Sequence, residues 1–273
     1  MNTRDTQIII EPNHLIHNYK TYQQKSSLEV FAVVKANAYG HGDIIVSKTL
    51  EPYVKVFCVS SLDEAIHLYH AGIRKDILIF SYVDIKMIEK YHQDNFIYTA
   101  LSLDWVKSLL TLNKKIRVHI KVDTGMNRVG IKDIEEIKEI LTLINVEGIY
   151  THFSSSDDNK EVTLHQLSQF ETILKDLNVS FKWVHTSNTH ASSYVTSKHI
   201  NAMRLGIGLY GYEKDTSDLK QVMHLMTKVI HLFEVDENET IGYNQTYKVD
   251  KKSKIATLPI GYADGIDMRF KYV

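Results

Sequence analysis

Short apolar runs recur at regular intervals along most of the chain. They cover residues 30–34, 55–60, 76–80, 95–100, 117–122, 146–152, 181–185 and 201–206. Runs of this length that are rich in branched apolar residues are typical of buried parallel strands. The segments between them have the apolar spacing of helices, for example at residues 63–68, 134–141 and 164–177. Eight strands alternating with helices predict an α/β fold with a closed (β/α)8 TIM barrel; an open doubly wound sheet is the alternative, which seldom needs eight such units.

The region before the first of these runs has its own pattern. Residues 8–10 are a short apolar run that predicts a strand, and Pro12 opens a predicted helix that continues through Tyr19. We expect the barrel domain to occupy residues 1–222.

Beyond Tyr210 the pattern of apolar and polar positions changes. Residues 226–233 alternate apolar and polar positions, as one antiparallel strand would, and residues 255–260 again predict a strand. Polar turns are predicted at residues 236–239, 242–244 and 261–265. We therefore expect residues 223–273 to be the start of a separate β domain, incomplete because it stops before it can close a barrel or a sandwich.

The composition narrows the class of protein. A chain of 273 residues with 44% hydrophobic and 24% charged residues has the balance of a globular protein with a sizeable core. The formal net charge of −1 gives no indication of binding to nucleic acid or to an acidic membrane surface. Cys58 is the only cysteine, so an internal disulfide is excluded. The apolar runs are too short for a signal sequence or a membrane span, and we expect a cytoplasmic protein.

Polar side chains follow the predicted strands where each strand ends. Lys35 follows the first strand, residues 121–128 follow the fifth, His152 closes the sixth, residues 185–189 follow the seventh and residues 204–207 follow the eighth. The carboxyl ends of barrel strands meet at one face, where barrel enzymes build their active sites. We therefore expect these groups to converge there.

Lys35 is the most distinctive of them, because an apolar strand delivers a single lysine to its end. A desolvated lysine has a lowered pKa and can form a Schiff base with an aldehyde, which is how pyridoxal phosphate is held. The loop that follows contains Tyr39 and two glycines, and it can bring backbone close to a ligand. The alternative is a lysine that reaches solvent from a strand end.

A pyridoxal phosphate site also needs groups for the phosphate and for the pyridine nitrogen. Tyr39, Thr189 and the backbone amides near Gly206 and Ile207 are candidates for the phosphate, with ordinary turn chemistry as the alternative. Arg204 is the candidate for the pyridine nitrogen, because a permanently charged guanidinium would keep that nitrogen unprotonated. The alternative for Arg204 is an ion pair, with Asp123 as the nearest candidate. We predict no metal site.

Three of these segments carry a resemblance to a known family. The sequence VVKANAYGHG at residues 33–42 resembles the pyridoxal phosphate signature of alanine racemases, KVDTGMNR at 121–128 resembles a second signature, and LPIGYADG at 258–265 is a strong further match. The likeness extends from Ile8 to Gly265. Family members continue further, so the chain is expected to be shortened at its C-terminus.

The resemblance assigns roles to the lysines and arginines. It implies that Lys35 binds the cofactor aldehyde and is one of two catalytic bases. Arg128 would contact the cofactor phenolic oxygen and the substrate carboxylate. Lys121 matches a lysine that is often carbamylated and braces that arginine. His152 matches a histidine that supports the arginine at the pyridine nitrogen, here Arg204.

The same resemblance assigns the phosphate end and the second base. Tyr39 matches a phosphate-binding tyrosine, and Asn188 and Thr189 match an Asn-Ser pair whose hydroxyl binds phosphate. RLGI at 204–207 covers the pyridine nitrogen and, through Gly206 and Ile207, the phosphate. GYNQTY at 242–247 is a weaker match, in which Tyr243 would be the second base, supplied by the partner subunit of a homodimer. Tyr262 would line the substrate entry.

The resemblance therefore implies interconversion of L-alanine and D-alanine by Lys35 and Tyr243, with pyridoxal phosphate as cofactor, to supply D-alanine for peptidoglycan. Two alternatives remain open. One is a barrel that binds pyridoxal phosphate with little or no turnover because of the shortened C-terminus. The other is a racemase of another amino acid.

Overall fold

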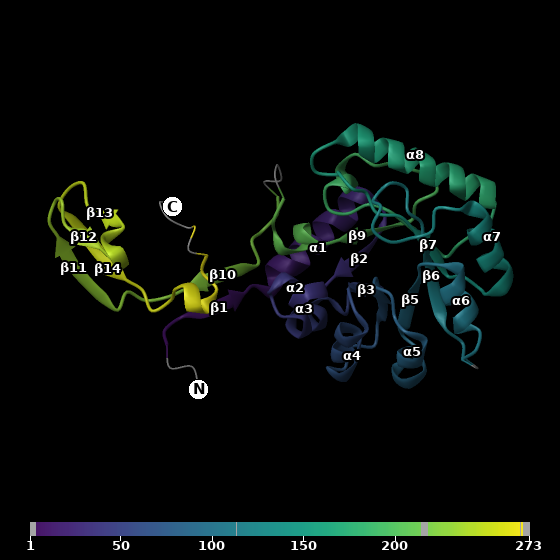
Figure 1. Cartoon of the computed structure of the whole chain (residues 1–273), viewed down its shortest axis with the longest axis horizontal. Helices are drawn as coiled ribbons and strands as arrows, with labels where there is room; N and C mark the ends of the chain where they lie inside the picture. The colour runs from purple at the N-terminus through teal and green to yellow at the C-terminus, as the bar shows by residue number, and fades with distance from the viewer. Residues whose placement is uncertain (1–3, 113, 214–217, 268, 270–273) are drawn as a thin grey trace. The chain divides into compact units, whose positions relative to one another are not determined.

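The computed structural model describes residues 4–112, 114–213, 218–267 and 269. The Cα packing separates two compact units (Figure 1). One is Glu11–Val222, and the other joins the N-terminal strand to the segment that begins at Met223.

The first unit is a closed barrel of eight parallel strands. They are β2 (Glu29–Val33), β3 (Val56–Val59), β4 (Asp76–Ile79), β5 (Phe96–Ala100), β6 (Arg117–Lys121), β7 (Gly148–Tyr150), β8 (Trp183–His185) and β9 (Ala202–Leu205). Each of the eight predicted apolar runs contains or overlaps one strand, and the strands follow one another around the barrel in sequence order. The open-sheet alternative is excluded, because β9 pairs back onto β2 with Leu205 opposite Ala32.

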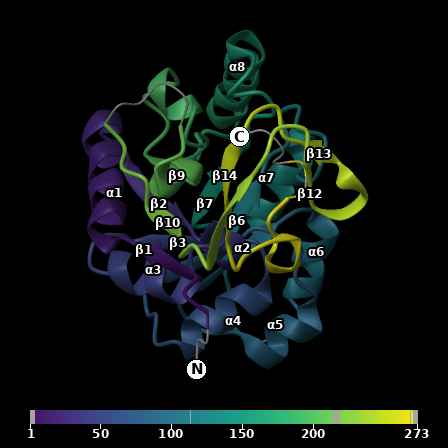
Figure 2. The same ribbon diagram turned by 90° about the vertical axis from the view of Figure 1, so that its left-hand side faces the viewer.

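Helices surround these strands (Figure 2). They are α1 (Pro12–Ser26), α3 (Asp43–Leu50), α4 (Leu62–His70), α5 (Ile85–Tyr91), α6 (Leu103–Leu109), α7 (Ile134–Leu143) and α8 (Lys160–Leu177). Short polar side chains begin most of them by accepting a backbone N–H of the first turn: Ser61, Asp84, Ser102, Asp133 and Asn159. Among the described residues, no helix combines the length and the apolar character needed to cross a membrane.

The barrel interior holds an apolar cluster and is charged at its amino-terminal end. Phe31, Val56 and Cys58 belong to a buried cluster contributed by several strands. At the amino-terminal end, Arg117 donates to Asp76 at 2.5 Å and to Glu147 at 2.7 Å, and Lys182 donates to Glu147 at 2.8 Å. We call Asp76, Arg117, Glu147 and Lys182 the floor cluster.

The second unit consists of three small antiparallel sheets. β1 (Gln7–Ile10) pairs with β10 (Met223–Met226), β11 (His231–Val235) with β14 (Ser253–Thr257), and β12 (Thr240–Ile241) with β13 (Tyr247–Lys248). Two 3-10 turns, η3 (Tyr243–Gln245) and η4 (Tyr262–Asp264), lie at predicted turn positions.

The prediction of a single strand over residues 226–233 is wrong. Met226 ends β10 and pairs with Gln7, whereas His231 begins β11 and pairs with Thr257, so two different partners divide the segment. Alternation of apolar and polar residues reports the exposure of a strand but not which strand it joins. The last predicted strand also stops earlier, at Thr257, two residues before Pro259, which has no N–H to donate.

Candidate active site

A cavity of about 510 Å³ opens within the barrel unit among the carboxyl ends of the strands. All nine residues predicted to bind the cofactor line it: Lys35, Tyr39, Arg128, His152, Asn188, Thr189, Arg204, Gly206 and Ile207. They are separated by up to 172 positions in the sequence, between Lys35 and Ile207. Closure of the barrel therefore brings together groups that the sequence scatters.

Lys35 enters the cavity from an unusual backbone turn. It begins α2 (Lys35–Tyr39), in which Ala36, Asn37, Ala38 and Tyr39 have φ values of 54°, 53°, 52° and 53°. Four consecutive non-glycine residues are thus left-handed, at a cost of roughly 1–2 kcal/mol for each. The sequence predicted a loop that brings backbone close to a ligand, and the structure has a strained left-handed turn at this place.

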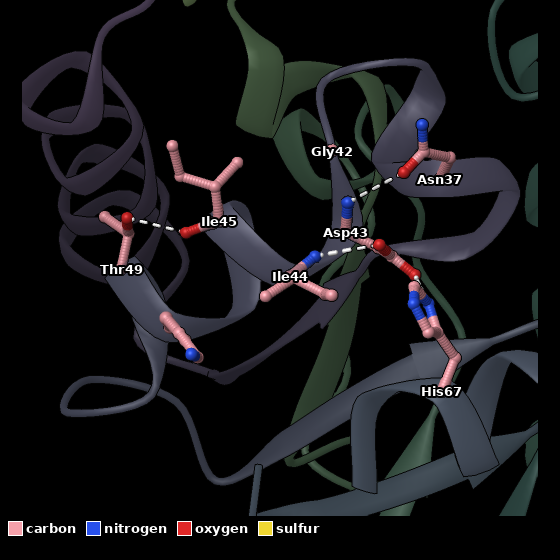
Figure 3. A pocket seen from close by; sticks show the side chains of 8 residues that line it. Asn37, Gly42, Asp43, Ile44, Ile45, Thr49 and His67 are labelled. Atoms are coloured by element: carbon pink, nitrogen blue, oxygen red, sulfur yellow. Dashed lines mark hydrogen bonds and ion pairs between the residues drawn. The ribbon is translucent and has the colours of Figure 1, made fainter. Parts of the chain in front are cut away.

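A side chain of α4 and one of the turn itself hold this turn in place. Glu64 accepts the N–H of Ala36 at 2.7 Å with one carboxylate oxygen and the N–H of Ser60 at 2.7 Å with the other. Asn37 Oδ1 accepts the N–H of Asp43 at 3.0 Å, and Asp43 pairs with His67 at 2.9 Å (Figure 3). Asn37, Asp43 and His67 also line a separate, open pocket. Together these hydrogen bonds fix the direction in which Lys35 leaves β2.

Both lysines of the cavity are shifted toward the neutral amine. Burial lowers the pKa of Lys35, and the nearby Arg128 lowers it further. Burial, with Arg128 and Arg204 close by, lowers the pKa of Lys121 to about 8. Lys121 is only 4% exposed, and within the described part of the chain its amine has no hydrogen bond or ion pair. A neutral amine is nucleophilic and basic, whereas an ammonium is neither.

Arg204 is buried at the end of β9 and is held by neutral groups. Its Nη1 donates to His185 Nδ1 at 2.6 Å, and its Nη2 donates to the carbonyls of Thr151 and Thr186 at 2.8 and 2.7 Å, with His152 Nδ1 at 3.4 Å. The alternative of an ion pair with Asp123 is not observed; Asp123 accepts backbone N–H groups of its own loop instead. Among the described residues, no acceptor is found for the Nε–H of Arg204 or for the second hydrogen of its Nη1, so this buried cation keeps unused donors.

The phosphate candidates lie together at the other side of the cavity. A Cβ on Gly206 would lie 3.0 Å from the hydroxyl of Tyr39, so the close approach of this hydroxyl favours a glycine. Thr189 Oγ1 accepts the N–H of Gly208 at 3.2 Å, in the first turn of η2 (Ile207–Tyr210). The N–H groups of Gly206 and Ile207 have no acceptor within the described ranges. A hydroxyl pair beside unpaired N–H groups suits a phosphate.

The structure also shows cavity residues that the sequence did not single out. Tyr150 stacks on His185 with ring centroids 4.6 Å apart, and the guanidinium of Arg204 lies 5.1 Å from the centre of the Tyr150 ring. Burial raises the pKa of Tyr150 to about 12. The available signal was spacing, because Tyr150 precedes His152 by two positions and alternate strand residues face the same side.

The two tyrosines predicted in the β region belong to the second unit. Tyr243 is 92% exposed and Tyr262 is 74% exposed. Among the described residues, neither side chain has a hydrogen bond or ion pair.

The cavity fits pyridoxal phosphate by its charges. Lys35, Lys121, Arg128 and Arg204 line it, and no carboxylate is found among its described lining residues. Of these four, Lys121 and Arg204 are buried, and buried cations without a counter-charge are unfavourable unless an anion joins them. Pyridoxal phosphate has a complementary group for each part of the cavity. Its phosphate suits Tyr39 and Thr189, its aldehyde suits Lys35, and its basic ring nitrogen suits the free Nε–H donor of Arg204.

Comparison with known proteins gives a consistent result. Residues 10–214 match the profile described as "Alanine racemase, N-terminal domain", and residues 222–272 match "Alanine racemase, C-terminal domain". The alanine racemases of Streptococcus suis and Listeria monocytogenes are 36% and 38% identical, each over 96% of this chain and 76% of the relative. The solved alanine racemase of E. faecalis has a TM-score of 0.87 at 33% identity, over 96% of this chain and 76% of that one. A histidine racemase of Leuconostoc mesenteroides, at 24% identity and a TM-score of 0.86, shares the fold.

Proposed function

The chain belongs to the alanine racemase family, whose members are isomerases that use pyridoxal phosphate, and from this premise we propose that it interconverts L-alanine and D-alanine. The observation that carries the proposal is the cavity at the strand ends, which Lys35 and the buried Lys121 and Arg204 line, with no carboxylate among its described lining residues. The relatives named alanine racemase support alanine as the substrate.

Pyridoxal phosphate is the proposed cofactor. When bound, it supplies an aldehyde that condenses with an amine and a conjugated ring that withdraws electrons from the substrate Cα. Lys35 would hold the aldehyde end, and Tyr39, Thr189 and the N–H groups of Gly206 and Ile207 would hold the phosphate. Arg204 would donate to the ring nitrogen, with His152 and Asn188 supporting this wall of the cavity.

Racemisation needs proton transfer on both faces of the substrate Cα. Lys35 Nζ is the proposed base on one face, since its lowered pKa favours the neutral amine. The hydroxyl of Tyr243 is the proposed acid or base on the other face. A single base would return the proton to the face from which it came, so two opposed groups are required.

Arg128 is the proposed anchor of the substrate carboxylate, because a guanidinium binds a carboxylate through two parallel hydrogen bonds. Lys121 lies beside it as an amine with a lowered pKa. Such an amine reacts with carbon dioxide, and the carbamate formed would give Arg128 an anionic partner. We propose this modification as the means by which Arg128 is braced.

We propose that the chain acts as a homodimer in which Tyr243 of the partner subunit completes the site. Exposed apolar side chains of the second unit, such as Ile230 and Leu232, support an interface on that unit. A cytoplasmic enzyme that supplies D-alanine for peptidoglycan is the proposed role. Tyr262 is the proposed residue at the substrate entry.

Purified protein loaded with pyridoxal phosphate tests the activity directly. With L-alanine we expect D-alanine to form, and with Lys35→Ala we expect the rate to fall by at least about 10³-fold. Lys86→Ala, an exposed lysine of α5, is the matched control and should retain the parental rate.

The assay is repeated with serine and histidine as substrates. A higher kcat/KM with either would replace alanine by another amino acid. Cofactor absorbance without any racemisation would favour the barrel that binds pyridoxal phosphate without turnover.

A further inference from the structure

Three hydrogen-bonded side chains lead from the cavity wall into the barrel interior. Arg204 on β9 lies 2.6 Å from His185 Nδ1 through its Nη1, and His185 Nε2 on β8 lies 3.0 Å from His119 Nδ1 on β6. Both histidines are fully buried, and His119 is not among the residues that line the cavity. Among the described residues, the one hydrogen bond of the His119 side chain is to His185, which links it to the cavity through Arg204.

The direction of these hydrogen bonds is fixed by chemistry. A guanidinium can only donate, so His185 Nδ1 must accept and carries no proton. Neutral His185 then holds its proton on Nε2 and donates it to His119 Nδ1. His119 in turn must hold its own proton on Nε2. The opposite arrangement would set two N–H groups against each other at 2.6 Å.

We propose that His119 is a positioning residue for Arg204. By accepting the proton of His185 Nε2, it keeps His185 Nδ1 available as the acceptor for Arg204 Nη1. Two of the three guanidinium nitrogens are then committed to the barrel wall, and Nε is left as the donor for a ligand in the cavity. The functional consequence rests on the proposed binding of pyridoxal phosphate, whereas the hydrogen-bond directions do not.

Packing alone does not account for a histidine at position 119. Its Nε2 is buried without a partner among the described residues, and an unpaired buried donor is unfavourable. An apolar side chain would avoid this cost in the same space. The ring also needs an opening in the intervening strand: a Cβ on Gly148 of β7 would lie 2.8 Å from three atoms of the His119 ring. Gly148, which is opposite His119 in the β6–β7 register, supplies that opening.

Burial, with help from nearby positive charges, favours the neutral form of both rings, as the arrangement requires. Burial lowers the pKa of His119 to about 3, with Arg117, Lys182 and Arg204 adding to the effect and Glu147 opposing it. Burial and Arg204 also hold the pKa of His185 well below its usual value. A protonated His185 would present a second positive charge to Arg204.

The unmodified chain tests the hydrogen-bond directions without any variant. Full-length protein labelled with nitrogen-15 in histidine is studied by long-range proton–nitrogen NMR, before and after addition of pyridoxal phosphate. We expect His119 and His185 each to show a protonated Nε2 and a bare Nδ1 in both states. A proton on Nδ1 of either ring would overturn the proposal, whatever the racemase assay shows.

Two variants of similar size then test the role of His119. Asparagine at this position retains an acceptor near the place of Nδ1, and leucine does not. In His119→Leu we expect the Nε2–H signal of His185 to move and kcat to fall by about 3- to 10-fold, with KM for alanine unchanged. In His119→Asn we expect both to return toward the parental values. Equal spectra and equal kcat in the two variants would overturn the positioning role.

Discussion

Two arginines of the barrel show how its two ends differ. Arg117 in the floor cluster donates to two carboxylates, and these hydrogen bonds and charges raise its pKa. Arg204 at the cavity is more deeply buried, donates to a histidine and two carbonyls, and has a lowered pKa because burial is not offset by a carboxylate. Carboxylates thus balance the charge of Arg117 at the amino-terminal end of the barrel, whereas Arg204 at the cavity has no carboxylate partner and keeps a free N–H donor.

The contrast separates stability from ligand binding. Two carboxylates satisfy the charge of Arg117, so the floor cluster joins β4, β6 and β7 when the chain folds. At the cavity, the charges of Lys121 and Arg204 have no ion pair within the described residues. Folding alone therefore leaves a destabilising positive field there, and an anionic ligand removes it. Substitutions at the cavity should therefore mainly change kcat/KM, and substitutions in the floor cluster should mainly change the free energy of unfolding.

Arg204→Met should have the largest effect on activity and a smaller effect on stability. Removing the donor to the ring nitrogen should lower kcat/KM for alanine by about 10²- to 10³-fold, as loss of a donor in an active site does. The buried charge also disappears, which offsets the loss of its hydrogen bonds to Thr151 and Thr186. Racemase kinetics and urea denaturation of the variant measure both. A large loss of stability with kcat/KM unchanged would assign Arg204 to the fold rather than to the site.

Arg117→Met should show the opposite balance. It leaves the carboxylate of Asp76 without a partner and Glu147 with Lys182 alone, both in a partly buried position, and we expect a loss of about 2–3 kcal/mol in the free energy of unfolding. Below the unfolding transition, kcat/KM should stay at the parental value. Lys138→Met, which removes an exposed pair with Glu135 on α7, is the control and should cost under about 0.5 kcal/mol. A drop in kcat/KM for Arg117→Met at full folding would contradict the separation of the two ends.

Lys121 should make stability depend on pH in a predictable direction. Its pKa is about 8 in the folded chain and near its usual 10.5 in the unfolded chain, so between these values the unfolded chain binds more protons. Stability should therefore rise with pH in this window, by at most about 1.4 kcal/mol per pH unit, and be constant below it.

The comparison is with Lys121→Met in bicarbonate-free buffer, by urea denaturation at several pH values. The variant should lack this rise. Identical pH profiles would mean that the amine is paired or solvated in the folded chain. Adding bicarbonate should flatten the parental profile if the carbamate forms, and mass spectrometry of the intact chain should then find one added carbon dioxide.

The sequence predicted the barrel and the residues around its cavity for one physical reason. Apolar runs of strand length that end in polar residues, such as the run before Lys35, indicate both the strands of the barrel and the face at which the site lies. The resemblance to alanine racemases at residues 33–42 and 121–128 added the roles.

Contacts between side chains of different strands could not be predicted from the sequence, because nothing near His119 indicates that its ring passes Gly148 to meet His185. The left-handed turn after Lys35 was also missed. Ala36 and Ala38 have no local preference for it, and the hydrogen bond from Glu64 that holds the turn comes from a residue 28 positions away. The prediction of one strand over residues 226–233 was wrong for a related reason, since the strands that pair with Met226 and His231 lie far away in sequence.

Tyr39→Phe should give the smallest change and is the finest test of the contrast. The Tyr39 hydroxyl lies against Gly206 at the cavity, and burial raises its pKa, so it is a neutral donor at neutral pH. Its loss should weaken pyridoxal phosphate binding by about 3- to 10-fold, the worth of one hydrogen bond. Tyr19→Phe is the matched control: its hydroxyl donates to the carbonyl of Tyr53 at 3.1 Å, away from the cavity. We expect Tyr19→Phe to lower the free energy of unfolding by about 1 kcal/mol with cofactor affinity unchanged.

Cofactor titration followed by fluorescence measures the affinity of each variant for pyridoxal phosphate, and urea denaturation measures its stability. If both variants lost stability equally and neither lost affinity, the Tyr39 hydroxyl would serve packing and the phosphate would have to be held by Thr189 and the backbone alone.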